Sequence, residues 1–170
     1  MTLTKLTQLT FTSNLVSGNL SSLARLTQLT VLKCSNNANI VGDLRPLASL
    51  VRLTTFWAAS CGLTGDLSPL AALTALTSID LRFNALTGYV SALQALTKMA
   101  VLALSSNSFS GDLAPLANMT SLVQLLLDNN KFSGTYIVIN MYCIFMVSII
   151  VDCRDTFGPV LSCSHVHTYM

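Results

Sequence analysis

The sequence contains no glutamate, and its seven acidic residues are all aspartates. Charged residues make up only 9% of the 170 residues, whereas hydrophobic residues make up 52%. This composition excludes a disordered chain, which needs low hydrophobicity and high net charge. The net charge of +2 is spread thinly, and no cluster of Lys or Arg occurs. We therefore expect no nucleic-acid partner, because such a partner is held by concentrated positive charge.

Motifs that carry chemistry are also missing. The five cysteines form no CxxC pair and have no zinc-type spacing with His165 or His167. Neither a glycine-rich phosphate loop nor an HRD-type catalytic loop of a kinase occurs. Thr, Lys and Gln interrupt the apolar residues near the start, so the sequence predicts no signal peptide. These absences predict a protein that is not an enzyme and that has no cofactor and no metal site.

The feature that dominates the sequence is an internal repeat. Glycines recur at intervals of 24, 23, 23, 23 and 23 residues, at Gly18, Gly42, Gly65, Gly88, Gly111 and Gly134. Four or five residues before each glycine stands an Asn or, once, a Cys: Asn14, Asn37, Cys61, Asn84, Asn107 and Asn130. One full unit, from Leu76 to Ala95, reads LTSIDLRFNALTGYVSALQA. It follows the pattern L-x-x-L-x-L-x-x-N-x-L-x-G.

This pattern identifies residues 3–134 as similar to leucine-rich repeat proteins. Its second half, G-x-L-x-x-L-x-x-L, resembles the plant-type repeat of receptor-like proteins and of protist surface antigens. The resemblance implies a protein-interaction or ligand-recognition module of a surface or receptor-like protein, located at a membrane or at the cell surface. The alternative is an intracellular scaffold or structural protein in the cytoplasm, which the missing signal peptide and the unpaired core cysteines favour.

The repeat predicts an α/β solenoid. In x-L-x-L-x the alternation has period two, so each unit supplies a short strand with residues such as Ile79 and Leu81 facing inward. After each glycine the apolar spacing becomes three, which fits a helical or 3₁₀ segment. We predict six repeats over residues 1–134, with parallel strands on the concave side and the helical segments on the convex side. The strands are expected near 9–11, 32–34, 56–58, 79–81, 102–104 and 125–127.

Asn and Cys residues are expected to stabilise the interior of the solenoid. The Asn of each unit stands where the chain leaves the strand, and its side chain is expected to bond backbone groups of its own and the next turn. Cys61 takes this place in one unit, and Cys34 occupies an inward strand position. We therefore expect both cysteines to be buried and structural, and not reactive.

The pattern stops after Gly134. Residues 135–151 form a largely apolar segment, and residues 152–170 form a short tail. One interpretation is a helix over 136–151 that contacts a membrane, although the run is shorter than the roughly 20 apolar residues of a typical span. A second is a degenerate seventh repeat, because Gly158 lies 24 residues after Gly134. A third interpretation is that this stretch belongs to no natural fold, for example because a reading frame continues past its natural boundary. The sequence leaves these alternatives open.

The outward strand positions predict the binding site. Parallel strands lie about 4.8 Å apart, so equivalent residues of successive repeats form continuous columns. The columns predict a ligand-binding strip for a protein or peptide, made of Lys33, Trp57, Asp80, Arg82, Leu126 and Asp128. Trp57 is the only Trp and is expected to be exposed. Exposed Trp and Arg are enriched at interface hot spots, although Asp80 and Arg82 are also placed to pair with each other.

Overall fold

The computed structural model describes residues 3–133 and 148–150 and has the form of a solenoid with three sides. One side is a seven-stranded parallel sheet, ordered as follows: β1 (Gln8–Thr10), β2 (Val31–Lys33), β4 (Thr55–Trp57), β6 (Ser78–Asp80), β8 (Val101–Ala103), β10 (Gln124–Leu126) and β12 (Ser148–Ile150). A second side is a five-stranded parallel sheet: β3 (Asn37–Gly42), β5 (Cys61–Gly65), β7 (Ala85–Tyr89), β9 (Ser108–Gly111) and β11 (Lys131–Phe132).

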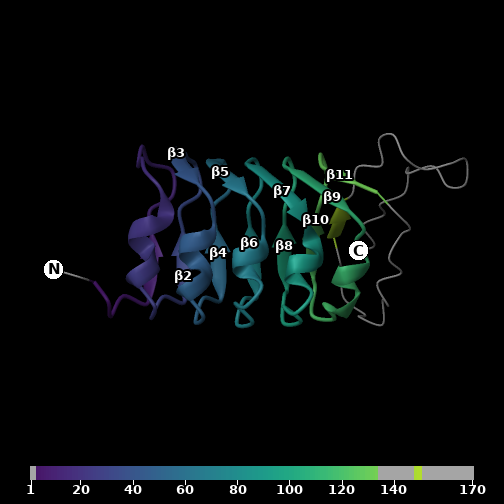
Figure 1. The fold of residues 1–170 in the computed structure, drawn as a ribbon, viewed down its shortest axis with the longest axis horizontal. Helices are drawn as coiled ribbons and strands as arrows, with labels where there is room; N and C mark the ends of the chain where they lie inside the picture. Colours follow the sequence, from purple (N-terminus) through teal and green to yellow (C-terminus); the bar gives the residue numbers. More distant parts are fainter. Residues whose placement is uncertain (1–2, 134–147, 151–170) are drawn as a thin grey trace, which may run out of the picture.

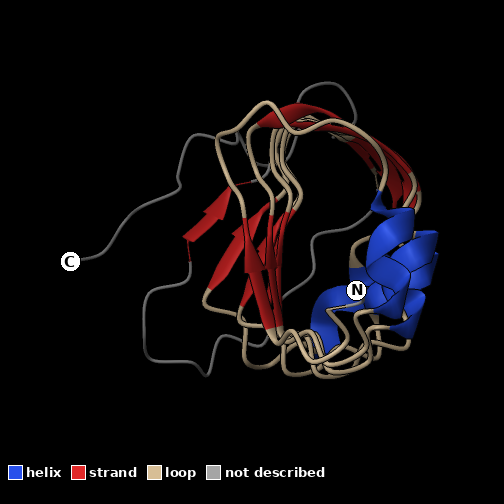
Figure 2. Cartoon of the chain, turned by 90° about the vertical axis from the view of Figure 1, so that its left-hand side faces the viewer, coloured by secondary structure: helices blue, strands red, loops and turns tan. Residues whose placement is uncertain are grey.

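Short 3₁₀ helices form the third side. They are η1 (Leu20–Arg25), η2 (Arg45–Ser49), η3 (Ser68–Leu70), η4 (Val90–Leu93) and η5 (Ala114–Asn118). Figure 1 shows the repeats following one another along the long axis, and Figure 2 shows the two sheets and the helices around the core in cross-section. Pro stands in the first turn of η2, η3 and η5, where its missing N–H costs no hydrogen bond.

The predicted solenoid is confirmed, and its strands lie one residue earlier than expected. The structure assigns β6 to Ser78–Asp80, where the sequence predicted 79–81. The inward positions are nonetheless as expected, because Ile79 and Leu81 are both fully buried. Ile79 pairs with Phe56 on one side and with Leu102 on the other, so equivalent residues lie in register.

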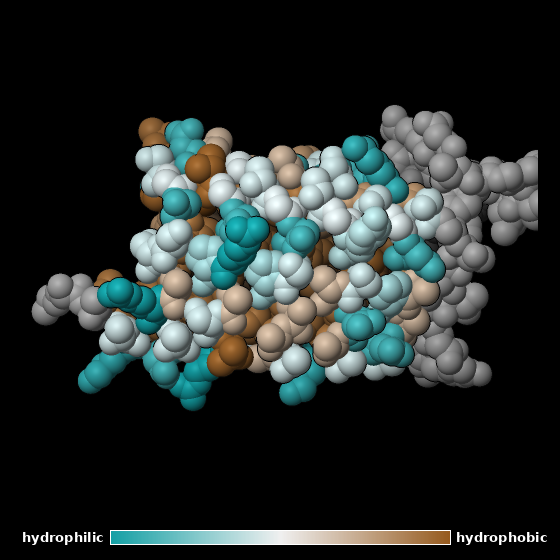
Figure 3. All heavy atoms as spheres, viewed as in Figure 1, coloured by the Kyte–Doolittle hydropathy of each residue, from teal (hydrophilic) through white to brown (hydrophobic). Residues whose placement is uncertain are grey.

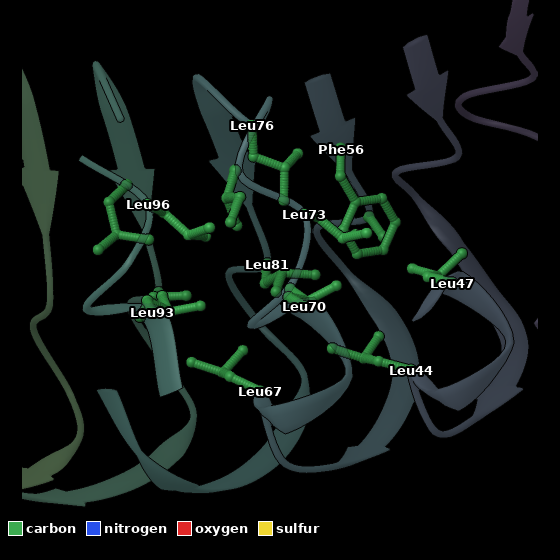
Figure 4. Packing of buried hydrophobic residues seen from close by; sticks show 14 of the residues in the cluster. Leu44, Leu47, Phe56, Leu67, Leu70, Leu73, Leu76, Leu81, Leu93 and Leu96 are labelled. Atoms are coloured by element: carbon green, nitrogen blue, oxygen red, sulfur yellow. The ribbon is translucent and has the colours of Figure 1, made fainter. Parts of the chain in front are cut away.

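The core lies between the strands and the 3₁₀ helices. The side chains of one repeat that fill it include Leu67, Leu70, Leu73 and Leu76, and all four are fully buried. Figure 4 shows these leucines beside their equivalents in the neighbouring repeats. The 23-residue interval therefore stacks leucine on leucine, and each buried Leu contributes roughly 1.5–3 kcal/mol by area.

The second sheet was not expected from the repeat pattern. That pattern predicted one strand and one helical segment per repeat, yet the segment that follows the Asn position is also extended and pairs in parallel with its neighbours. This segment carries a single core residue in some units, such as Leu86 between Ala85 and Thr87. One buried residue is too short a period-two signal to identify a strand from sequence.

The Asn side chains at equivalent positions of the repeats, here called the Asn column, connect successive repeats. They are Asn14, Asn37, Asn84, Asn107 and Asn130, and Cys61 stands at this position in the third repeat. The Asn84 amide donates to the carbonyls of Ala58, Leu81 and Arg82, and its Oδ1 accepts from Leu63 N–H at 3.0 Å. Asn107 and Asn130 repeat this arrangement. The bonds thus join each repeat to the preceding one, and not to the next one as predicted, because the strand end that the side chain reaches belongs to the previous unit.

Residues 148–150 bear on the open question of the tail. They form β12, which pairs in parallel with β10, with Leu125 opposite Ile149. A strand therefore stands where the helix over 136–151 was predicted to end. The rest of that predicted helix lies outside the described residues. In the part of the chain that the structure describes, no helix is long and apolar enough to cross a membrane.

Candidate functional site

The candidate site lies on the outward side of the seven-stranded sheet, here called the strand face. Two columns of side chains make it up. The first column is Thr10, Lys33, Trp57, Asp80, Ala103 and Leu126, and the second is Thr12, Ser35, Ala59, Arg82, Ser105 and Asp128. Because the register is continuous from β1 to β10, residues of one column are direct neighbours on adjacent strands.

Lys33 and Trp57 form the first contact on this face. The Nζ atom of Lys33 lies 3.6 Å from the centroid of the Trp57 ring, which is a cation–π arrangement. The indole Nε1 donates a hydrogen bond to Ser78 Oγ at 2.9 Å. Trp57 is consequently half-buried and not fully exposed, which corrects the sequence-based expectation. Lys33 on one neighbouring strand and Ser78 on the other thus hold the Trp57 ring in one orientation before any partner binds.

Asp80 and Arg82 form the second contact. Arg82 Nε donates to Asp80 Oδ1 at 2.9 Å, and a terminal Arg82 nitrogen donates to Oδ2 at 2.8 Å. These bonds raise the pKa of Arg82, with smaller contributions from the charges of Asp80 and Asp128. The side chains are 37% exposed for Arg82 and 16% exposed for Asp80. The pair therefore presents mainly its guanidinium to solvent.

The remaining predicted residues lie further along the face. Asp128 accepts a hydrogen bond from the Ser105 hydroxyl and another from Asn129 at 3.3 Å. Its charge also raises the pKa of Arg82, by less than the bonds to Asp80 do. Leu126 is half-buried. The strand face thus brings together Lys33 with Trp57 and Asp80 with Arg82, while Leu126 and Asp128 extend the same columns.

Phe83 borders the candidate site but was not among its predicted residues. The residue that precedes each Asn position has a positive φ in all six units: Ser13 (55°), Asn36 (59°), Ser60 (55°), Phe83 (55°), Ser106 (58°) and Asn129 (54°). Five of these are small or polar, whereas Phe83 is aromatic and 57% exposed. A left-handed backbone is strained for a bulky residue. Phe83 directly follows Arg82, so this exposed ring, on a strained backbone, borders the strand face.

The opposite side has a different character. Figure 3 views the side that carries the 3₁₀ helices, where hydrophilic and neutral residues dominate and hydrophobic residues are scattered. Scattered apolar residues are normal on a protein surface and indicate no binding site. Among the described residues, no group of three or more His, Cys, Asp or Glu side chains could hold a metal ion.

Comparison with known proteins places this geometry in a class. No protein-family model and no curated protein matches the chain. Solved structures do match, among them an internalin from Listeria monocytogenes, with 35% identity, a TM-score of 0.68, and coverage of 76% of this chain and 36% of that one. The chain is a leucine-rich repeat protein.

Within that class, the chain is similar to the ectodomains of plant peptide-hormone receptors. The plant receptor RGFR1, solved in complex with RGF2, is 30% identical, with a TM-score of 0.78 and coverage of 86% of this chain and 24% of that one. The Arabidopsis receptor kinase HAESA, solved with the peptide hormone IDA and the co-receptor SERK1, is 35% identical, with a TM-score of 0.71 and coverages of 75% and 22%. The chain therefore spans about a quarter of the length of these receptors.

Proposed function

We propose that this chain is a non-catalytic recognition module that binds a peptide, or an extended segment of a protein, along the strand face. The observation that carries the proposal is a row of two paired contacts on adjacent strands. Lys33 on β2 contacts Trp57 on β4, and Asp80 on β6 pairs with Arg82, two residues after the end of β6. Lys33 stacks on Trp57, Trp57 donates to Ser78, and Arg82 pairs with Asp80, so these side chains are positioned before a partner binds. Preorganised aromatic and Arg side chains lower the entropic cost of binding.

The comparisons support the same proposal. Two of the similar structures, RGFR1 and HAESA, were solved with peptide hormones bound. The exposed guanidinium of Arg82 suits a carboxylate of such a peptide, and the Trp57 ring suits an apolar or cationic side chain. We further propose that the module acts at the cell surface, as those ectodomains do. We also propose that β12, which extends the ladder, belongs to a degenerate seventh repeat.

The experiment selects binders and then asks where they bind. Random linear peptides are selected on the immobilised full chain, and the affinity of the selected peptides is measured by calorimetry. We expect Trp57→Ala and Arg82→Ala each to weaken binding by roughly 1–4 kcal/mol, with unfolding free energies nearly unchanged. The matched control is Arg45→Ala, which removes an exposed arginine that pairs with Asp43 on the 3₁₀ side. Equal affinity of all three variants for every selected peptide would contradict the proposal.

A further inference from the structure

The junction between the second and third repeats holds two cysteines in contact. Cys34 follows β2, points into the core and is fully buried, and Cys61 begins β5 and is 8% exposed. The Sγ atom of Cys61 lies 3.5 Å from the Cys34 carbonyl oxygen and 3.7 Å from the Ala59 carbonyl oxygen. The Cys61 thiol thus donates to the backbone of Cys34, which brings the two cysteines into contact. Both thiols are free in this structure.

Both cysteines replace the residue types that other repeats hold at these positions. The residues equivalent to Cys34 are Phe11, Ala58, Leu81, Leu104 and Leu127, and those equivalent to Cys61 are Asn14, Asn37, Asn84, Asn107 and Asn130. The two substitutions fall at the same junction, where the Cys61 thiol contacts the Cys34 backbone. A thiol is a much weaker donor than the Asn amide that bridges three carbonyls elsewhere. Cys61 nevertheless donates to the Cys34 and Ala59 carbonyls, which correspond to two of the three carbonyls that Asn84 reaches, so it keeps part of the Asn bonding as expected.

The backbone at this junction is adapted as well. The second repeat is one residue longer than the others, and β3 shows a register shift between Asn37 and Val41 where it pairs with β5. Gly62, directly after Cys61, leaves room for this bulge, because a Cβ there would lie 3.0 Å from a Val41 methyl carbon and 3.2 Å from the Ala38 carbonyl oxygen. The bulge and Gly62 thus shape the backbone on both sides of the Cys61 thiol.

The electrostatics divide the two thiols into unequal partners. The interaction with Cys34 lowers the pKa of Cys61 to about 7, against the effect of burial and with help from the Asn37 backbone. The same contact, together with deeper burial, raises the pKa of Cys34. A substantial fraction of Cys61 is then thiolate at neutral pH, with a protonated thiol beside it, which is the arrangement of an attacking and a resolving cysteine.

We propose that Cys34 and Cys61 are a hydroperoxide-reactive pair that closes into a disulfide between the second and third repeats. The Cys61 thiolate attacks a hydroperoxide, so that an S–O bond forms, the O–O bond breaks, and the departing oxygen takes up a proton to leave as an alcohol or as water. The Cys34 thiol then attacks the Cys61 sulfenic acid. An S–S bond forms, the S–O bond breaks, and the hydroxyl leaves as water with the Cys34 proton. Two thiols are oxidised and one peroxide is reduced.

The cross-link would lie directly behind the candidate site. Cys34 follows Lys33 in the chain, and its N–H donates to the Trp57 carbonyl at 2.8 Å. A Cys34–Cys61 disulfide would therefore join the backbone beneath the Lys33–Trp57 contact to the Asn position of the next repeat. Because Trp57 is the only Trp of the chain, its fluorescence reports on this contact without labelling.

The test uses the full chain with Cys143, Cys153 and Cys163 replaced by Ser, so that only the proposed pair remains. The protein is treated with hydrogen peroxide, blocked with iodoacetamide and measured by intact mass and by tryptic digestion without reductant. Trypsin cuts after Lys33, Arg52 and Arg82, so Cys34 and Cys61 fall on different peptides. We expect a mass loss of about 2 Da, one cross-linked peptide pair and protection of both thiols from alkylation.

Two variants separate a specific pair from general oxidation. Cys34→Ala places at this position the residue that Ala58 supplies in the next repeat, so the fold is expected to be retained. In this variant the cross-link disappears and Cys61 proceeds to sulfinic acid, and in Cys61→Ser the mass stays unchanged. The proposal is overturned if the parent protein reaches sulfinic acid at Cys61 without a cross-link. It is also overturned if both thiols still alkylate fully on unfolding after peroxide treatment.

Discussion

The Asn column makes its sharpest prediction at Asn84. Replacing Asn84 by Ala removes one accepted and three donated hydrogen bonds. Two of the carbonyls keep a second partner, because Arg82 O accepts from Ser60 N–H and Leu81 O accepts from the Asn107 amide. The Leu63 N–H and the Ala58 carbonyl instead lose the Asn84 partner, each inside a buried repeat junction.

An unpaired buried backbone group costs about 1–3 kcal/mol. Two such groups give an expected loss of about 2–6 kcal/mol, a large part of the roughly 5–15 kcal/mol that stabilises a typical domain. The assay is urea unfolding followed by circular dichroism, with the slope of the transition compared to confirm that the same cooperative unit unfolds.

Asn14 is the matched control for this prediction. It stands at the same position of the first unit, but it is exposed and its amide bonds only carbonyls of its own repeat, at 2.9 and 3.3 Å from Thr12 and Phe11. Asn14→Ala should therefore cost less than about 1 kcal/mol. Equal losses for the two variants would refute the reasoning, because the stabilisation would then come from the local turn and not from the bonds between repeats.

Other residues give predictions of the same kind. Phe83→Asn should stabilise the fold by about 1 kcal/mol in thermal unfolding, because Asn tolerates the left-handed backbone; a loss of stability would show that the ring packs usefully. Tyr89→Asp should raise the melting temperature, corresponding to about 0.5–1 kcal/mol, because its equivalent before η3, Asp66, accepts the Ser68 N–H, a bond that a Tyr side chain cannot supply at the start of η4. The rate of peroxide consumption by Cys61 should rise with pH and reach half its maximum near pH 7, because only the thiolate reacts and the Cys34 contact lowers its pKa to about 7; a midpoint above pH 8 would contradict this.

Much of the candidate site was accessible from the sequence, for a definite reason. The period-two alternation assigns Lys33, Trp57, Asp80 and Arg82 to the outward side, and the 23-residue interval places them on neighbouring strands. What they contact there was not accessible. The stacking of Lys33 on Trp57, the bond from Trp57 to Ser78 and the resulting partial burial of the ring depend on side-chain rotamers, which no spacing encodes.

The sequence by itself determined the solenoid, its repeat register and its buried leucines, because a fixed interval of apolar residues has one way to bury them all. It did not determine the second sheet, whose segments carry too little periodicity, or the direction of the Asn bonds. Only the tertiary structure decided that Cys34 and Cys61 meet, since this contact joins residues 27 positions apart through a bulge that shifts the register. A linear pattern fixes which way a residue points, and the neighbour that it meets depends on how adjacent turns of the chain are packed.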